Sequence, residues 1–505
     1  MLRAYRSDDV RKAEAPLLER GEPLMDRAAA ALATEVIRRV RAAGNRVPGT
    51  EVLGLVGTGN NGGDVLFALA RLTRRGMSAY AISAGRLHSG GRAAAERAGV
   101  RFADAGDLRG LAEATDVWLD GLVGIGARGP LRDAALEIVA ELEEVRARRG
   151  VEPLVIAADV PSGIGADDGT VAGLALHADV TVTMGIAKPG LVLDPGRRYA
   201  GEIVQVPLGL EEFLPSEPAL MSLTARDIAD MWDVPGPDSH KYTRGVVGVM
   251  TGSLRYPGAA LLSTGAALAG GAGMVRYAGP REISQLVVSH HPEVVTDLGR
   301  VQAWVLGSGV DMDVAEAASE VARRLQEAVT EGIPVVLDAG AISLVGALDV
   351  PSTVVITPHA GELAELLASR GEPMSREEIA AAPSRAARLA ATLTGATVLL
   401  KGSVDLACAP DDPLWAQGGA AGWRATAGAG DVLAGLLGSI LAQRGDELAD
   451  LGKGHGIPAR LAAAASYIHG RAAAIAYGTG QPIVASQIAG AIPQAIGEAL
   501  ASTSE

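Results

Sequence analysis

The 505-residue chain is predicted to be an α/β protein with two domains, each built around a mostly parallel β-sheet. Short apolar runs alternate with helix-compatible segments, which is the order expected when crossover helices join parallel strands. Most of these runs end in polar or glycine-rich turns. The pattern lapses into EEFLPSEPALMS at residues 211–222. We therefore place a linker at about 213–222, between a domain at 1–212 and a domain at 223–505.

Composition excludes several classes of partner. A formal net charge of −14 repels nucleic acid and anionic membranes, and an aromatic content of 3% leaves few stacking platforms for single strands. The single cysteine, Cys408, has no partner for an internal disulfide, and charges occupy the start of the chain where a signal peptide has its apolar core. We expect a cytoplasmic homo-oligomer that binds neither nucleic acid nor a membrane.

The amino-terminal domain is predicted to begin with two helices between residues 11 and 41, where apolar residues recur at helical spacing. A strand at 52–56 then enters the loop GTGNNGGD at 57–64, and a helix runs from there to about residue 75. This loop does not match the dinucleotide fingerprint G-x-G-x-x-G. The oxygens of its paired asparagines suit a hard cation or the hydroxyl groups of a substrate.

Four more strands are predicted in this domain, at 78–82, 116–123, 154–158 and 180–184, with a helix at about 131–149. Polar groups follow three of them: Asp120, the segment DVPSG at 159–163, and KPG at 188–190. Each group alone could be an ordinary turn or loop cap. Ligands of open parallel sheets bind beyond the carboxyl ends of the strands, so together with the asparagine loop these groups form a candidate site.

The carboxyl-terminal domain repeats this organisation. Strands are predicted at 246–250, 301–306, 334–337, 353–356 and 396–400. Glycine or polar turns follow them on one rim, among them Gly307-Ser308-Gly309, Asp338, TPHAGE at 357–362 and Lys401-Gly402. A capping box at Ser375 and Glu378 is predicted to open one helix that runs to about Leu393.

The segment ATAGAGDVLAG at 425–435 joins a glycine turn to an apolar helix. Glycines permit close approach of a ligand, and a helix that begins near Gly430 directs unpaired N–H groups and its positive dipole end at that ligand. Phosphate suits such a place, and Asp431 could accept a proton from a hydroxyl acceptor. An ordinary turn with Asp431 as helix cap fits the same residues.

The motifs GNNGGD, D-x-x-x-G-x-G, DVPSG and KPGL together resemble the NAD(P)H-hydrate epimerase domain over about residues 1–212, which implies a Rossmann-like sheet. By this resemblance a potassium ion is ligated by Asn61, Asp120 and Ser162. Asp159 and Lys188 are the candidate catalytic acid and base. The implied substrate-binding residues are Asn60, Asn61, Gly62, Gly63, Asp64, Gly124, Ile125, Gly126, Ala127, Arg128, Gly129, Pro130 and Asp159.

The motifs HK-x-x-x-G, YPGAA, G-x-G, TPHAGE, KG and AGAGD resemble the ribokinase-like ADP/ATP-dependent NAD(P)H-hydrate dehydratase over about residues 223–505. The resemblance implies Asp431 as catalytic base, Mg²⁺ on the nucleotide phosphates, and two sets of binding residues. The hydrate would face Ala259, Gly309, His359 and Asp431. The nucleotide would be held by Lys401, Gly402, Ser403, Val404, Asp405, Ala427, Gly428, Ala429 and Gly430. The chain departs from the family pattern at Val65, Ser308, Asp405 and Ala427.

Together the two resemblances imply repair of hydrated NADH and NADPH (NADHX and NADPHX). The first domain would interconvert the R and S hydrates. The second would dehydrate the S hydrate with ADP or ATP through a phosphorylated intermediate. Two alternatives stay open: a ribokinase-like small-molecule kinase with a stable product, and a non-catalytic ligand-binding scaffold. The residues do not distinguish ADP from ATP.

Overall fold

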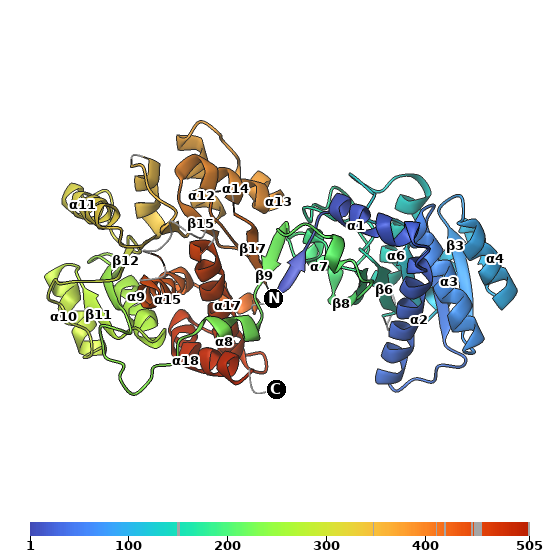
Figure 1. Cartoon of the computed structure of the whole chain (residues 1–505), viewed down its shortest axis with the longest axis horizontal. Helices are drawn as coiled ribbons and strands as arrows, with labels where there is room; N and C mark the ends of the chain where they lie inside the picture. Colours follow the sequence, from blue (N-terminus) through green and yellow to red (C-terminus); the bar gives the residue numbers. More distant parts are fainter. Residues whose placement is uncertain are drawn as a thin grey trace. The chain divides into compact units, whose positions relative to one another are not determined.

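The computed structural model describes residues 1–148, 152–346, 348–410, 412–418, 421–445, 448 and 457–502. The chain divides into two compact units, Arg3–Ala219 and Leu220–Glu505, with Met1–Leu2 belonging to the second (Figure 1). Each unit contains one large sheet, so the predicted α/β class with two sheets is confirmed. Within the described ranges, no helix combines the length and hydropathy needed to cross a membrane.

The first unit contains a seven-stranded sheet in the order β4-β3-β2-β5-β6-β7-β8, with every neighbouring pair parallel. The five predicted strands are present, and the short β4 and the edge strand β8 are additional. The strands are β2 (Glu51–Val56), β3 (Ser78–Ser83), β4 (Arg101–Ala103), β5 (Val117–Gly121), β6 (Leu154–Ala158), β7 (Val180–Met184) and β8 (Glu202–Val206).

Helices cover both faces of this sheet. Leu69 of α3 packs with Val52 and Val56 in one apolar cluster, and Leu142 of α6 packs with Leu53 and Leu55 in another, as the alternation of side chains along a strand requires. The helices are α1 (Ser7–Glu19), α2 (Leu24–Ala42), α3 (Asn60–Arg74), α4 (Ser89–Ala98), α5 (Leu108–Ala114), α6 (Asp133–Arg148) and α7 (Arg197–Ala200), with the 3₁₀ turns η1 (Ala105–Asp107), η2 (Pro189–Leu191) and η3 (Glu211–Phe213).

Two predicted boundaries in this unit change. The asparagines expected in a loop form the first turn of α3, which begins at Asn60, because Gly59 in an extended conformation already supplies the turn out of β2. The helix expected at 131–149 begins at Asp133, and Arg149 lies outside the described residues.

The second unit contains a ten-stranded sheet in the order β1-β9-β17-β16-β15-β14-β13-β12-β10-β11. The five predicted strands form its parallel centre, and the antiparallel strands β16 and β17 extend it. The strands are β1 (Leu2–Ala4), β9 (Leu220–Ser222), β10 (Val246–Met250), β11 (Met274–Tyr277), β12 (Ala303–Leu306), β13 (Val335–Leu337), β14 (Val354–Ile356), β15 (Thr397–Leu400), β16 (Asp405–Cys408) and β17 (Leu414–Gln417).

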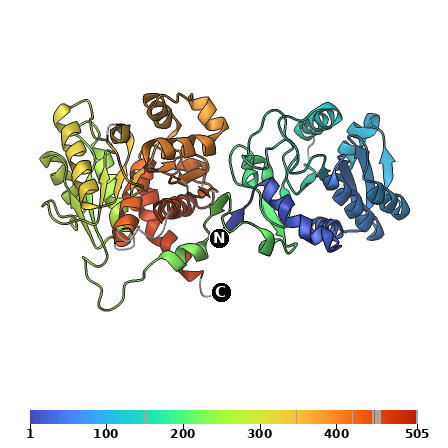
Figure 2. The same cartoon turned by 45° about the horizontal axis from the view of Figure 1, so that its top comes forward.

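Buried helices form the core of this unit. Leu433 and Leu437 of α15 and Ile468 of α17 belong to one apolar cluster with strand residues, and Figure 2 shows these red helices between the green-yellow and the orange elements. The helices are α8 (Ala225–Met231), α9 (Pro257–Ala269), α10 (Arg281–His290), α11 (Ala315–Glu331), α12 (Ala360–Ser369), α13 (Arg376–Ala381), α14 (Pro383–Thr394), α15 (Ala429–Gln443), α17 (Ile457–Tyr477) and α18 (Ala485–Ala501), with η4 (Ala339–Gly346) and η5 (Gly422–Arg424).

The single helix predicted from the Ser375 capping box to Leu393 is wrong. The box itself is present, because Ser375 and Glu378 exchange side-chain and backbone hydrogen bonds of 2.7 and 3.1 Å. The helix stops at Ala381 and a second begins at Pro383, since a residue before proline is driven out of the helical region and Ala382 has φ −139° and ψ 58°.

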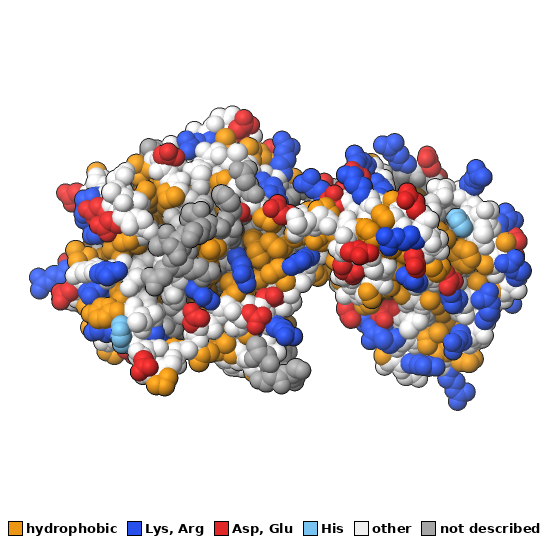
Figure 3. Space-filling view, viewed as in Figure 1, with side chains coloured by type: hydrophobic (Ala, Val, Ile, Leu, Met, Phe, Trp, Pro, Cys, Tyr) orange, Lys and Arg blue, Asp and Glu red, His pale blue; other side chains and the backbone are white. Residues whose placement is uncertain are grey.

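Charges of both signs are interspersed on the face of each unit that is visible in Figure 3. Many of them pair locally, as Arg109 does with Glu141 and Glu144 at 2.9 and 2.7 Å. Exposed pairs of this kind contribute little to stability, so the energetically important charges are the buried ones.

Candidate functional sites

A cavity of about 520 Å³ in the first unit lies where β2, β5 and β6 end and α3 begins. Eight predicted substrate-binding residues line it: Asn60, Asn61, Asp64, Gly124, Ile125, Gly126, Ala127 and Asp159. The other predicted residues of this site are absent from its lining: Gly62, Gly63, Arg128, Gly129, Pro130 and Lys188. Sequence reasoning missed Arg11 and Glu14 of α1, whose helix carries no motif that signals a site.

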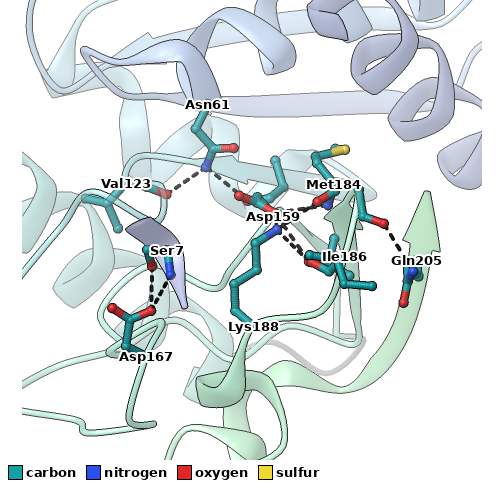
Figure 4. A network of polar contacts seen from close by, with 12 residues as sticks. Ser7, Asn61, Val123, Asp159, Asp167, Met184, Ile186, Lys188 and Gln205 are labelled. Atoms are coloured by element: carbon teal, nitrogen blue, oxygen red, sulfur yellow. Dashed lines mark hydrogen bonds and ion pairs between the residues drawn. The ribbon is translucent and has the colours of Figure 1, made fainter. Parts of the chain in front are cut away.

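Asp159 and Lys188 form a buried ion pair beside this cavity (Figure 4). The Lys188 side chain is fully buried, and its Nζ also donates to the Met184 carbonyl at 2.9 Å and to Thr183 Oγ1 at 3.1 Å. Asp159 follows β6 and has φ 65°, a left-handed backbone conformation that is uncommon for residues other than glycine. Such conformations cluster at functional sites. Asp159 lines the cavity, whereas Lys188 is its fully buried counter-ion and is absent from the lining.

Two further carboxyl groups face the same cavity with altered proton affinity. Burial, with the Asp159 carboxylate adding to it, raises the pKa of Asp64 well above its ordinary value. Burial and the same carboxylate raise the pKa of Glu14. The cavity thus combines carboxyl groups that retain a proton more readily with one carboxylate that is held by a lysine, which is the arrangement needed for proton donation and acceptance.

Asp120 and Ser162 lie in direct contact next to this site. Ser162 Oγ donates to Asp120 Oδ1 at 2.6 Å, and the Ser162 N–H donates to Oδ2 at 2.8 Å. The Val123 N–H donates to Ser162 Oγ at 3.2 Å, and Asn61 Nδ2 donates to the carbonyls of Val123 at 2.7 Å and Ala158 at 2.9 Å. The three predicted potassium ligands are therefore joined in one network around Val123.

The donor set of this network fits a hard monovalent cation. Asp120 and Ser162 offer carboxylate and hydroxyl oxygens. Burial raises the pKa of Asp120, and the described groups that donate to its carboxylate, Ser162 and Leu122, are uncharged, so a cation would supply the missing charge. Asn61 turns its amide nitrogen towards the carbonyls, and ligation through its oxygen requires the amide to turn over. Among the described residues, no group of three or more His, Cys, Asp or Glu has the arrangement of a metal site.

A second cavity, of about 700 Å³, lies in the carboxyl-terminal unit at the start of α15. The predicted residues that line it are His359, Lys401, Gly402, Ser403, Asp405, Gly428, Ala429, Gly430 and Asp431. Ala259, Gly309, Val404 and Ala427 are absent from its lining. Sequence reasoning assigned no role to four charged or titratable side chains that line it: Asp338, Arg376, Arg424 and His469.

Asp431 is the third residue of α15 and does not cap the helix. Gly428 is the N-cap residue with φ 88°, and no side chain accepts a capping hydrogen bond there. The alternative in which Asp431 is a helix cap is therefore wrong. A side chain at position 428 would adopt a strained left-handed backbone, so the glycine is what turns the chain into the helix.

The proton affinity of Asp431 is set by its own burial and by the neighbouring ion pair of Asp338 and Lys401. Burial and the Asp338 carboxylate raise the pKa of Asp431 to about 6, against the opposing effects of the Lys401 ammonium and the Ser308 hydroxyl. Asp338 accepts from Lys401 Nζ at 2.7 Å, Thr357 Oγ1 at 2.7 Å and Ser308 Oγ at 2.8 Å. Burial opposes ionisation of Asp338, but the Lys401 charge and these hydrogen bonds lower its pKa. A base with a pKa near neutrality results.

The structure also shows how Asp405 is accommodated. Its carboxylate accepts from Arg424 at 2.5 and 3.1 Å, from Ser466 Oγ at 2.6 Å and from the Gly402 N–H at 2.9 Å. Its negative charge is therefore compensated within the protein. His359 caps α12 through Nδ1, which accepts from the N–H groups of Gly361 and Glu362 at 3.0 and 3.1 Å, and it also lines the cavity.

Comparisons with known proteins match each unit separately. Residues 21–190 match the family model described as YjeF-related protein N-terminus, and residues 247–494 match the NAD(P)H-hydrate dehydratase model. Residues of the amino-terminal part are 44% identical over 216 residues to the NAD(P)H-hydrate epimerase of Clavibacter michiganensis, covering 41% of this chain and 90% of that one.

The crystal structure of ADP/ATP-dependent NAD(P)H-hydrate dehydratase from Bacillus subtilis, co-crystallised with ATP/Mg²⁺, aligns with a TM-score of 0.46 and 24% identity, covering 55% of this chain and 97% of that one. The bifunctional NAD(P)H-hydrate repair enzyme Nnr of Mycobacterium tuberculosis is 40% identical over 454 residues, which is 87% of this chain and 89% of the relative. With both units covered by that similarity, the chain belongs to the family of bifunctional NAD(P)H-hydrate repair enzymes.

Proposed function

We propose that this chain repairs hydrated NADH and NADPH, with epimerisation of the R and S hydrates in the first unit and ADP- or ATP-dependent dehydration of the S hydrate in the second. The observation that carries the proposal is Asp431, a carboxyl group with a pKa of about 6 beside the glycine turn of α15. The similarity to a bifunctional NAD(P)H-hydrate repair enzyme over 87% of the chain supports the same proposal. A base of this kind next to an anion-binding helix start is what phosphoryl transfer to a hydroxyl needs.

In the second unit, Asp431 accepts the proton of the C6 hydroxyl while that oxygen takes the terminal phosphoryl group of the nucleotide. The C6–O bond then breaks as the lone pair of the ring nitrogen forms a C=N bond, phosphate leaves, and loss of the adjacent ring proton gives NAD(P)H. Lys401 and the N–H groups at the start of α15 stabilise phosphate charge. Mg²⁺ would be held by the nucleotide phosphates, whose charge it would partly neutralise when bound.

In the first unit, the cavity with Asp159 is the proposed place of epimerisation. Burial raises the pKa values of Glu14 and Asp64, so either carboxyl group is suited to donate a proton to the departing hydroxyl group, and Asp159 can accept one when water adds to the opposite face of C6. Lys188 holds the Asp159 carboxylate in place. Potassium would be held by Asn61, Asp120 and Ser162, where its charge stabilises ionised Asp120 when bound.

The proposal is tested by adding ADP or ATP with Mg²⁺ to purified protein and a mixture of NADH hydrates and following the recovery of NADH absorbance. Recovery of the whole mixture requires both activities, since a stereospecific dehydratase restores one epimer. A small-molecule kinase would instead accumulate a lasting phosphorylated product, and a scaffold would give no turnover. The domain bounds 1–212 and 223–505, a cytoplasmic location and a homo-oligomeric state remain predictions.

A further inference from the structure

His469 of α17 is a buried polar side chain without a partner in a place where a ligand is expected. Only 2% of its surface is exposed, and the ring contributes to the wall of the 700 Å³ cavity. Among the described residues, neither Nδ1 nor Nε2 has a hydrogen-bond partner. Buried polar groups in folded proteins are nearly always hydrogen-bonded, so this ring is missing a partner that the cavity can admit.

The ring is uncharged at neutral pH. Burial, followed by the Arg424 charge, lowers the pKa of His469 to about 4. The Asp405 carboxylate and the Ala429 backbone oppose this effect. The Ala429 backbone does not reach hydrogen-bond geometry with the ring. A neutral imidazole offers one N–H donor and one acceptor nitrogen. The Arg424 and Lys401 cations that lower this pKa also disfavour a metal ion at the ring and favour an anion.

The neighbours of His469 locate that anion. The Ala429 backbone lies close enough to affect the proton affinity of the ring, and Ala429 is the first residue of α15, whose unpaired N–H groups suit an anion. Arg424, whose charge also acts on the ring, lines the same cavity. We infer that His469 donates a hydrogen bond to the phosphate groups of the nucleoside di- or triphosphate in this cavity. The inference rests on the proposed nucleotide site and adds a binding residue to it.

The test measures ADP binding to the full chain by calorimetry with Mg²⁺ present. His469→Leu removes both nitrogens at similar volume, and its ADP affinity should fall about 10- to 100-fold, the effect of one hydrogen bond to a charged group. His469→Gln keeps a donor and should recover most of that loss. The unliganded Leu variant should unfold at the same temperature as the wild type or higher, because an unpaired buried polar group has been removed.

Thr264→Val is the matched control. The Thr264 hydroxyl of α9 is also buried and has no partner among the residues described, yet it is absent from the cavity lining. Its removal should leave ADP affinity unchanged. Should His469→Leu lower the unfolding temperature, His469→Met is measured in its place, and the same loss of ADP affinity is expected.

Wild-type ADP affinity in the apolar variants would overturn the inference. A loss for ADP without an equal loss for inorganic pyrophosphate would also overturn it, because the contact would then be with base or ribose. The proposed function fails separately: wild-type protein that binds ADP but does not restore NADH refutes the dehydratase and leaves the assignment of His469 intact.

Discussion

The substitution Asp431→Asn tests the catalytic base and the electrostatics of the second cavity together. Asn keeps the shape of the side chain but cannot accept a proton, so nucleotide-dependent dehydration should fall by about 10²- to 10⁴-fold, the usual effect of losing a general base. In the wild type, a pKa of about 6 predicts that the rate falls about tenfold for each pH unit below 6. The variant should lose this dependence.

The Asp431→Asn variant should be more stable than the wild type, although its activity falls. Folding raises the pKa of Asp431 from an ordinary 3.8 to about 6, a shift of about two units. The ionised form of Asp431 therefore lowers the free energy of unfolding by about 3 kcal/mol at most. Between pH 4 and 6 the folded state binds more protons than the unfolded state, so this cost grows with pH and is complete above pH 6. Asp431→Asn should therefore stabilise the protein by up to this amount at pH 7 and leave stability unchanged below pH 4.

The assay follows NADH recovery with ADP or ATP and the nucleotide-free interconversion of the two hydrates in one preparation, with urea unfolding measured at pH 4 and 7. Epimerisation should be unchanged, because Asp431 belongs to the carboxyl-terminal unit. Unchanged dehydration would refute the assignment of Asp431 as the base. Equal loss of both activities would indicate general damage, and a less stable variant at pH 7 would refute the proposed cause of the raised pKa.

Three other predictions concern the buried charges and the domains. Asp120→Asn should abolish any dependence of epimerisation on potassium while dehydration persists, and a potassium response that survives would exclude Asp120 as a ligand. Arg424→Met leaves the buried Asp405 carboxylate uncompensated and should destabilise the protein by about 3–5 kcal/mol in urea unfolding, with most of the loss recovered when Asp405→Thr is added; no recovery would contradict the pairing argument. A fragment of residues 1–212 should fold and epimerise hydrates without nucleotide, and an unfolded or inert fragment beside an active full chain would reject independent domains.

Local patterns in the chain were sufficient for most of the fold. The central strands of both sheets are apolar runs ended by polar or glycine turns, and strand length and turn chemistry are properties of neighbouring residues. The missed edge strand β8 has the sequence EIVQV, whose three β-branched residues are a signal that sequence reasoning could have used. The break at Pro383 was readable too, because proline acts on the residue directly before it.

The glycine turn before α15, the asparagines of α3 and the aspartates at strand ends likewise mark their own positions, because a ligand edge of a parallel sheet is defined strand by strand. The residues that pair with these groups cannot be identified from their neighbours in the sequence. Asp338 pairs with Lys401 across 63 residues of sequence, and Ser466 reaches Asp405 across 61. Glu14 and His469 lie on helices whose sequences look like ordinary core or surface. Their proton affinities depend on burial and on charges brought near by folding, and neither quantity is a property of nearby residues in the chain.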